Sequence, residues 1–330
     1  MLNSQNRIFG YDLIKTIAIF MIVFYHLGGI DIGIIESGKY FLPNFNQFVL
    51  SFCAASVPLF LMVHGALILP KRLNLKESIL KAIKMVLLFL FGKIVLQLVV
   101  LEKCFSIGDK MVHFWFLGTL GIVYGVSYFL NKWKWLRHIV LLMLIIYPFF
   151  SNLLVDCIVF FKPGSNFLSL GHDGFYTFYA LVYFYLGYYL KYKTHTRYFS
   201  LLTITAGVLL INFEVVSLSN YYQMVYDGVN GSFPTIGALA LSTGLFLLLK
   251  DTNSSNCLIR DSISFIGSNT MGVYLFHVLV IFLLRKYGVC ESLGMPSSIM
   301  ISCLIILVIA LFSHFIKIVF ESLLNYQNYK

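Results

Sequence analysis

Long apolar runs limit this chain to a membrane fold. Hydrophobic residues make up 59% of its 330 residues and charged residues only 12%, whereas a soluble domain usually carries about a quarter charged residues. A helix needs about 20 apolar residues to cross the roughly 30 Å hydrocarbon core of a bilayer. The runs therefore predict an all-α, polytopic integral membrane protein with about ten transmembrane helices, over residues 8–30, 46–69, 78–101, 112–131, 136–160, 174–191, 198–219, 232–250, 265–286 and 297–321.

The distribution of basic residues predicts the orientation of these helices. Most of the 24 Lys and Arg residues lie at the chain ends and in alternate connecting segments. Cytoplasmic loops of membrane proteins are enriched in Lys and Arg, so both termini are expected in the cytoplasm, which an even number of spans allows. The net charge of +10 is then a membrane feature, and no nucleic-acid partner is expected. We expect residues 1–330 to form one integral membrane domain in contact with lipid, with no appended soluble domain.

Motifs of several other protein classes are missing from the sequence. The six Cys residues are scattered, without the Cys or His spacing of a zinc or iron–sulfur site, so no metal site is expected. The sequence also contains no P-loop, no Gly-x-Ser-x-Gly and no His-Glu-x-x-His. These absences argue against nucleotide hydrolysis and against a soluble hydrolase.

The first apolar run contains three ionisable residues, in the stretch DLIKTIAIFMIVFYH. Asp12 and Lys15 are three residues apart and can pair on one face of a helix. Lys15 and His26 share that face but are separated by about three turns, or about 16 Å. The pair could simply anchor the helix at the membrane interface, and His26 could pack between helices. Alternatively, the face could hold a long ligand, with its anionic end near Lys15 and its reacting end near His26.

Other ionisable residues allow the same two interpretations, because such groups are costly in lipid and often functional. His113 and Glu214 lie toward the predicted outer side, and His277 lies within a span. An isolated carboxylate in lipid would be protonated or would draw in water, so Glu214 is the hardest to explain as mere packing. Four basic residues near the predicted inner side could orient the protein or bind an anion: Lys71, Arg72, Lys81 and Lys84.

Several stretches, in order, resemble the acyltransferase 3 family of membrane O-acyltransferases. YDLIKTIAIFMIVFYH resembles the first family helix, in which an Asp is followed by an Arg three residues later and a His after ten more residues. SVPLFLMVHGALILPKR is similar to the second helix, and KAIK stands where the family carries Arg-x-x-Arg. Similar to later segments are HFWFLGTLGIVYGVSYFL, FYALVYFYLGYYLK and NTMGVYLFHVLVIFLL. The resemblance runs from about residue 7 to about residue 290.

The resemblance implies an activity and a location. A member of this family moves an acetyl group, usually from acetyl-CoA, to a hydroxyl of a bacterial surface or exported polysaccharide or of a lipid-linked sugar. Acetyl-CoA would be a co-substrate rather than a tightly bound cofactor, and the protein would span the cytoplasmic membrane of a bacterium. Polysaccharide synthesis machinery is a possible partner.

The resemblance also assigns roles to residues of this chain. His26 and Asp12 would be the catalytic residues, with His26 taking part in transfer, and whether His26 acts as a general base or carries the acetyl group stays open. The donor-binding residues would be Lys15, Lys81, Lys84, Lys71 and Arg72. Acceptor-side or supporting residues would be His113, Trp115, Tyr124, Glu214 and His277.

Two departures from the family pattern bear on the donor site. Lys replaces Arg at residue 15 and in KAIK, which keeps the charge but loses the bidentate geometry with which Arg binds phosphate. His64 stands where the family usually has Ser.

Two other functions fit a protein with many helices and intramembrane charges. One is a transporter or flippase of a lipid-linked glycan, although the charged groups do not recur in two halves as internal repeats of transporters would suggest. The other is a non-catalytic partner in a polysaccharide synthesis complex.

Overall fold

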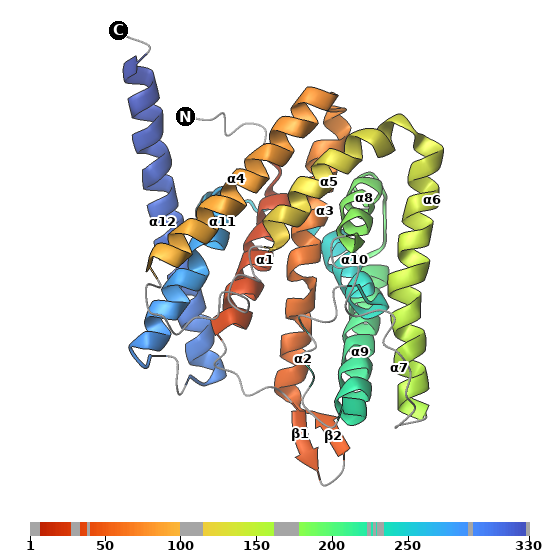
Figure 1. The fold of residues 1–330 in the computed structure, drawn as a ribbon. Coiled ribbons are helices and arrows are strands. Elements are labelled where there is room, and N and C mark those ends of the chain that lie inside the picture. Colours follow the sequence, from red (N-terminus) through yellow and green to blue (C-terminus); the bar gives the residue numbers. More distant parts are fainter. Residues whose placement is uncertain are drawn as a thin grey trace. The chain divides into compact units, whose positions relative to one another are not determined.

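The computed structural model describes residues 7–27, 34–37, 40–99, 115–161, 178–222, 226, 229, 234–289 and 293–327. Helices dominate these ranges, as predicted (Figure 1). One small antiparallel hairpin was not predicted: β1 (Ile34–Ser37) pairs with β2 (Tyr40–Pro43). The helical class is therefore confirmed, with one short hairpin added to it.

Internal contacts divide the chain into two compact units. The terminal unit comprises Met1–Asp31 and Leu249–Lys330, and the central unit comprises Ile32–Leu248. The terminal unit thus joins the two ends of the chain, and each unit has its own set of internal contacts. A single membrane domain over residues 1–330 stays a prediction.

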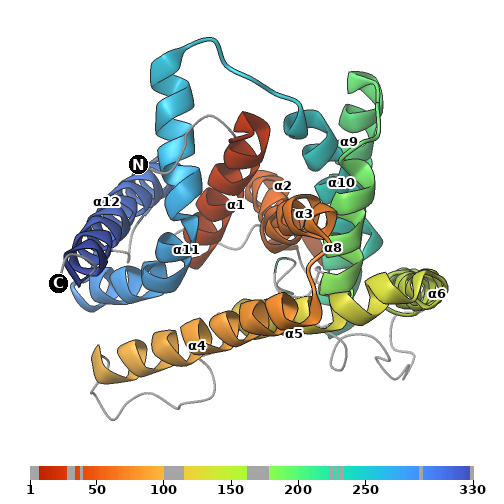
Figure 2. The ribbon, with the colours of Figure 1, turned by 90° about the horizontal axis from the view of Figure 1, so that it is seen from above.

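Three helices make up most of the described part of the terminal unit. They are α1 (Phe9–Leu27), α11 (Cys257–Lys286) and α12 (Met295–Gln327). Helix α1 packs against both others, and α11 also packs against α12 (Figure 2). Helix α11 begins at a side-chain cap, because Asn256 Oδ1 accepts hydrogen bonds from the backbone N–H groups of its first turn, 2.9 and 3.3 Å away.

Two helix pairs organise the central unit. Helix α3 (Ser56–Ile68) packs against α8 (Tyr179–Leu190), and α4 (Leu75–Val99) packs along α5 (Trp115–Lys132) (Figure 2). A Cβ atom on Gly65 of α3 or on Gly187 of α8 would overlap the backbone of the partner helix, so small residues allow the close approach, as is common in membrane helix pairs.

The remaining described helical elements complete the chain order, and all lie in this unit except the last two residues of α10, Leu249 and Lys250, which belong to the terminal unit. They are α2 (Phe45–Ser51), 3₁₀ turns at Phe52–Ala55 and Leu69–Lys71, α6 (Lys134–Leu144), a π-helix (Ile145–Phe150), α7 (Ser151–Phe161), α9 (Arg197–Tyr222) and α10 (Ile236–Lys250).

Half of the predicted spans meet the length and hydropathy needed to cross a bilayer. The described helices that do so cover Phe9–Leu27, Phe45–Lys71, Arg197–Tyr221, Cys257–Lys286 and Met295–Val319. The other predicted spans also coincide with helices, but α8 has 12 residues and α10 has 15. At 1.5 Å per residue these rise only about 18 and about 22 Å, less than the roughly 30 Å core. Ten crossings and cytoplasmic termini therefore stay predictions.

Candidate functional site

A buried carboxylate at the start of α1 is held by two cations. Arg7 donates from Nε to Oδ2 of Asp12 at 2.8 Å and from a terminal nitrogen to Oδ1 at 2.7 Å. Lys15 Nζ lies 2.7 Å from the same Oδ1, and Asp12 is only 3% exposed. The Asp12–Lys15 pair expected from their spacing therefore forms, and Arg7 adds the bidentate geometry that makes such pairs strong.

This charged cluster also joins α1 to α11. Lys15 Nζ donates a 2.7 Å hydrogen bond to the carbonyl oxygen of Gly267. Gly267 has no side chain to keep the helices apart, and a Cβ atom there would lie 2.8 Å from Cβ of Asp12. A Lys ammonium has three donor hydrogens, so Asp12 and Gly267 occupy two of those that Lys15 could offer a ligand.

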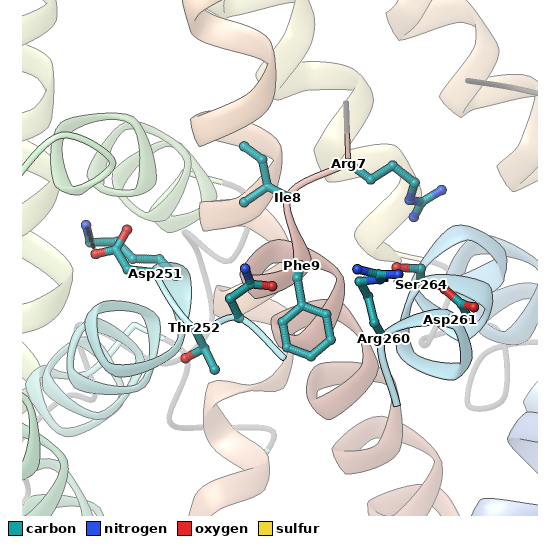
Figure 3. Close-up of a pocket in the computed structure, with 10 residues that line it drawn as sticks. Arg7, Ile8, Phe9, Asp251, Thr252, Arg260, Asp261 and Ser264 are labelled. Carbon is teal, nitrogen blue, oxygen red and sulfur yellow. Dashed lines mark hydrogen bonds and ion pairs between the residues drawn. The ribbon is translucent and has the colours of Figure 1, made fainter. Parts of the chain in front are cut away.

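A polar cavity of about 610 Å³ opens beside this cluster (Figure 3). It lies between the N-terminal end of α1, the segment that follows α10 and the first turns of α11. A Cβ atom on Gly10 would lie 2.6 Å from the carbonyl oxygen of Leu249, so α1 and the last residues of α10 are in close contact. The cavity is lined by Arg7, Ile8, Phe9, Lys250, Asp251, Thr252, Asn253, Arg260, Asp261 and Ser264.

Two imidazole rings meet near the other end of α1. The ring centroids of His26 on α1 and His277 on α11 are 5.4 Å apart, with the planes tilted by 42°. His277 is fully buried and His26 is half-buried. The sequence analysis named both residues, but their contact could not be derived because they are 251 positions apart along the chain.

The backbone of α11 fixes the orientation and tautomer of His277. Its Nδ1 lies 2.8 Å from the carbonyl oxygen of Tyr274 and 3.1 Å from that of Val273. Carbonyl oxygens only accept hydrogen bonds, so Nδ1 carries a hydrogen, and Nε2 is the accepting nitrogen of the neutral ring. The arrangement can present a basic nitrogen at a fixed place within the helix pair.

An arginine of α11 holds the end of α1 that carries His26. Arg285 donates to the carbonyl oxygens of His26 at 2.9 Å and of Leu27 at 3.3 Å. The last carbonyls of a helix have no partner within the helix, so this cation satisfies them and favours the negative end of the helix dipole. The backbone of His26 is thereby tied to α11 beyond the ring contact.

The predicted acceptor-side residues of the central unit do not form one described cluster. Tyr124 Oη lies 2.8 Å from Nδ1 of His64, which links α5 to α3. The ring of Trp115 lies 6.1 Å, centroid to centroid, from that of Tyr179. Glu214 is buried on α9, with 2% exposure, and His113 lies outside the described residues.

The predicted donor-binding residues are divided between the two units. Lys15 belongs to the terminal unit, whereas the other four belong to the central unit. Lys71 and Arg72 are exposed just after α3, and Arg72 adopts a left-handed backbone with φ 46°. On α4, Lys81 is half-buried and Lys84 is exposed, and their spacing places them one turn apart. Among the residues the structure describes, no group of three or more His, Cys, Asp or Glu could hold a metal ion.

Comparison with known protein families decides the class of the chain. A family model described as "Acyltransferase domain" matches residues 8–315. The chain belongs to the acyltransferase 3 family. The resemblance seen in the motifs is therefore confirmed, over both the terminal and the central unit. Because five helices within the described ranges are long and apolar enough to span a bilayer, this family member is a multi-pass membrane acyltransferase. Neither the comparison with curated proteins nor that with solved structures gives a match.

Proposed function

We propose that this acyltransferase 3 protein moves an acetyl group from acetyl-CoA to a hydroxyl of a surface or exported polysaccharide or of a lipid-linked sugar. The start of α1 would face the cytoplasm of a bacterial cell, and the protein would lie in the cytoplasmic membrane. The observation that carries the proposal is the layout of α1: a cationic cluster around Asp12 at one end and the His26–His277 ring pair near the other. An elongated donor lying along such a helix could have its anionic end near the charged end of α1 and its thioester near an imidazole.

His26 would act on the reacting atoms, because the resemblance matches it to the family histidine and it is only partly buried. As a general base it would take the proton of the sugar hydroxyl while the sugar oxygen attacks the thioester carbonyl. The carbon–sulfur bond then breaks, the acetyl group becomes an ester, and the proton passes from His26 to the departing CoA thiolate. As an acyl carrier, a nitrogen of His26 would instead attack the thioester carbonyl, the carbon–sulfur bond would break, and the departing CoA thiolate would take the proton that the imidazole loses. In a second step the sugar oxygen would attack the acetyl-imidazole, the carbon–nitrogen bond would break, and the hydroxyl proton would pass to the freed His26.

His277 would be a positioning residue for His26. Its Nδ1 is engaged by the backbone of its own helix, so Nε2 can accept a hydrogen bond from His26 or from a group bound beside it. A hydrogen bond to one nitrogen of an imidazole sets which nitrogen of that ring is basic. The contact thus supports a defined tautomer of His26 at the moment of transfer.

The experiment that tests the proposal is NMR of cell-surface glycan from cells that express the wild-type protein or His26→Ala. We expect O-acetyl signals to disappear in His26→Ala while the protein remains in the membrane. His195→Ala provides a matched control, because His195 lies in the segment between α8 and α9 and should leave acetylation intact. Glycan that stays fully acetylated in His26→Ala cells would contradict the proposal. If His26→Ala instead stops export of the glycan, and the glycan that is still made keeps its O-acetyl groups, a flippase or a synthesis partner would be favoured.

A further inference from the structure

The cavity beside the start of α1 is large enough for a ligand and is not explained by the His26 end of the helix. Its volume of about 610 Å³ falls within the roughly 300–1,000 Å³ typical of small-molecule sites. Figure 3 shows side chains from the start of α1, from the segment after α10 and from the start of α11 around the same space. All of them belong to the terminal unit.

The cations of the cavity differ in how firmly they are paired. Arg7 is bound in bidentate fashion to Asp12, and the buried ammonium of Lys250 lies 2.7 Å from Asp251. Arg260 is different, because its Nε lies 3.8 Å from Asp261 and both side chains are more than half exposed, at 53% and 75%. Exposed pairs of this kind contribute little stability, so Arg260 can exchange its partner for a ligand anion at small cost.

The rest of the lining matches a nucleotide more closely than a bare anion. The ring of Phe9 lies between Thr252 and Arg260 in Figure 3 and offers a flat apolar face on which a base can stack. The hydroxyl and amide groups of Thr252, Asn253 and Ser264 can bind ribose and base edges. A cavity lined by a guanidinium, an aromatic ring and neutral polar groups is thus suited to a phosphate with a nucleoside attached.

We propose that this cavity binds the phosphorylated nucleotide end of the acyl-CoA donor, with Arg260 as the principal phosphate ligand and Phe9 as the surface for the base. The assignment rests on the proposed function. It moves the donor's anionic end away from Lys15, because Asp12 and Gly267 already engage the ammonium of that residue. Arg260 can also bind phosphate in the bidentate geometry that Lys15 lacks.

The length of α1 agrees with this placement. From Phe9 to His26 the helix rises about 25 Å, and the His26 side chain leans back toward the start of the helix, which shortens the distance to be covered. CoA carries its nucleotide at one end and its thioester at the other, joined by a long pantetheine arm. An extended donor with its nucleotide in the cavity would therefore direct its thioester along α1 toward His26.

Direct binding tests the cavity without any turnover. The probe is adenosine 3′,5′-bisphosphate, titrated into purified full-length protein by calorimetry. Arg260→Gln should weaken binding about ten- to a hundredfold, as expected for a lost charge-assisted hydrogen bond. Asp261→Asn, which removes a negative charge from the same cavity, should tighten binding about two- to fivefold. Arg197→Gln removes an exposed cation from the start of α9 and should leave the affinity unchanged. Equal affinities for wild type and Arg260→Gln would overturn the proposal.

Kinetics separate the cavity from the acetyl-transfer proposal. Arg260→Gln should raise the KM for acetyl-CoA but not the KM for S-acetyl-pantetheine, which has no nucleotide. Unequal bisphosphate affinities without any acetyl transfer would support the cavity and contradict the proposed function. Acetyl transfer with an unchanged KM for acetyl-CoA in Arg260→Gln would support the proposed function and contradict the assignment of the cavity.

A phospholipid headgroup is the other source of a phosphate at this site. Native mass spectrometry of the purified protein distinguishes the two sources. If Arg260→Gln releases a bound anionic phospholipid while bisphosphate binding stays as in wild type, the cavity is a lipid site and the nucleotide assignment is wrong. Loss of bisphosphate binding with lipid retention unchanged supports the nucleotide assignment.

Discussion

The two ends of α1 are joined to α11 by different chemistry. Near its start, a buried carboxylate is neutralised by Arg7 and Lys15, and the two helix backbones come close at Gly267. Near its other end, the imidazole rings of His26 and His277 meet. There His277 hydrogen-bonds to a backbone carbonyl of α11, and Arg285 of α11 donates to a backbone carbonyl of α1. Ion pairs that are already complete suit a structural junction, whereas imidazole rings, which can take up and release a proton, suit proton transfer.

The comparison predicts that removing the contacts at the start of α1 lowers the free energy of unfolding more than removing those near His26. Asp12→Ala should destabilise the terminal unit by about 3–5 kcal/mol, because it leaves Arg7 and Lys15 close together without the buried carboxylate that neutralises them. The loss of stability is measured by heating the purified protein in detergent and determining how much folded protein remains at each temperature. Asp261→Asn, at an exposed pair, serves as the control and should change stability by no more than about 1 kcal/mol. Similar melting curves for Asp12→Ala and wild type would contradict a structural junction.

A methyl group at the helix contact should have the next largest effect. Gly267→Ala places a Cβ atom 2.8 Å from Cβ of Asp12 and 3.0 Å from its Cα, so α1 and α11 must separate at a cost of about 1–3 kcal/mol. Gly125→Ala is the matched control, since a Cβ atom on Gly125 of α5 meets nothing within 4 Å and Ala favours a helix. Equal unfolding temperatures for the two variants would show that the contact tolerates the methyl group.

The second end should respond in turnover rather than in stability. His277→Asn keeps an amide that can donate to the carbonyls of Val273 and Tyr274 but removes the nitrogen at the Nε2 position. We expect kcat to fall about two- to tenfold, the effect of one neutral hydrogen bond, with the KM for acetyl-CoA unchanged.

His277→Gln supplies the control for that experiment. Its longer side chain can place an amide oxygen near the Nε2 position and should recover part of the lost kcat. A merely structural role for His277 would instead lower the unfolding temperature in both variants and leave kcat per folded molecule as in wild type.

The smallest predicted effect concerns the basic residues of α4. If Lys81 and Lys84 bind the donor, Lys81→Glu and Lys84→Glu should each raise the KM for acetyl-CoA a few-fold, because exposed charges act weakly through water. The half-buried Lys81 should have the larger effect of the two. A KM equal to that of wild type in both variants would remove these residues from the donor site and leave them as orientation signals.

Local features of the site followed from the sequence, and long-range features did not. The Asp12–Lys15 pair follows from helical spacing alone. The bidentate pairing of Arg7 with Asp12 was not predicted. Arg7 precedes the helix, and helical spacing does not indicate where a side chain outside the helix points. Nothing local in the sequence marks Gly267 as the residue that meets Asp12, because that contact depends on how α1 and α11 pack.

The cavity and the hairpin were missed for related reasons. By sequence alone, Arg260 and Lys250 fit basic residues of connecting segments that orient a membrane protein, whereas in the structure the end of α10 and the start of α11 bring both to one space. For the hairpin, the short runs IIES and YFLP contain β-branched or aromatic residues and flank a Gly-Lys pair, a recognisable turn signal.

The central claim is that His26 transfers an acetyl group from acetyl-CoA to a sugar hydroxyl. The most direct measurement supplies acetyl-CoA labelled in its acetyl carbon to purified protein with the glycan acceptor, and follows the label. We expect label in the glycan with wild-type protein and a rate lower by about 10²–10⁴-fold with His26→Ala, the usual contribution of a general acid or base. Label that reaches the glycan equally fast with both proteins would contradict the account.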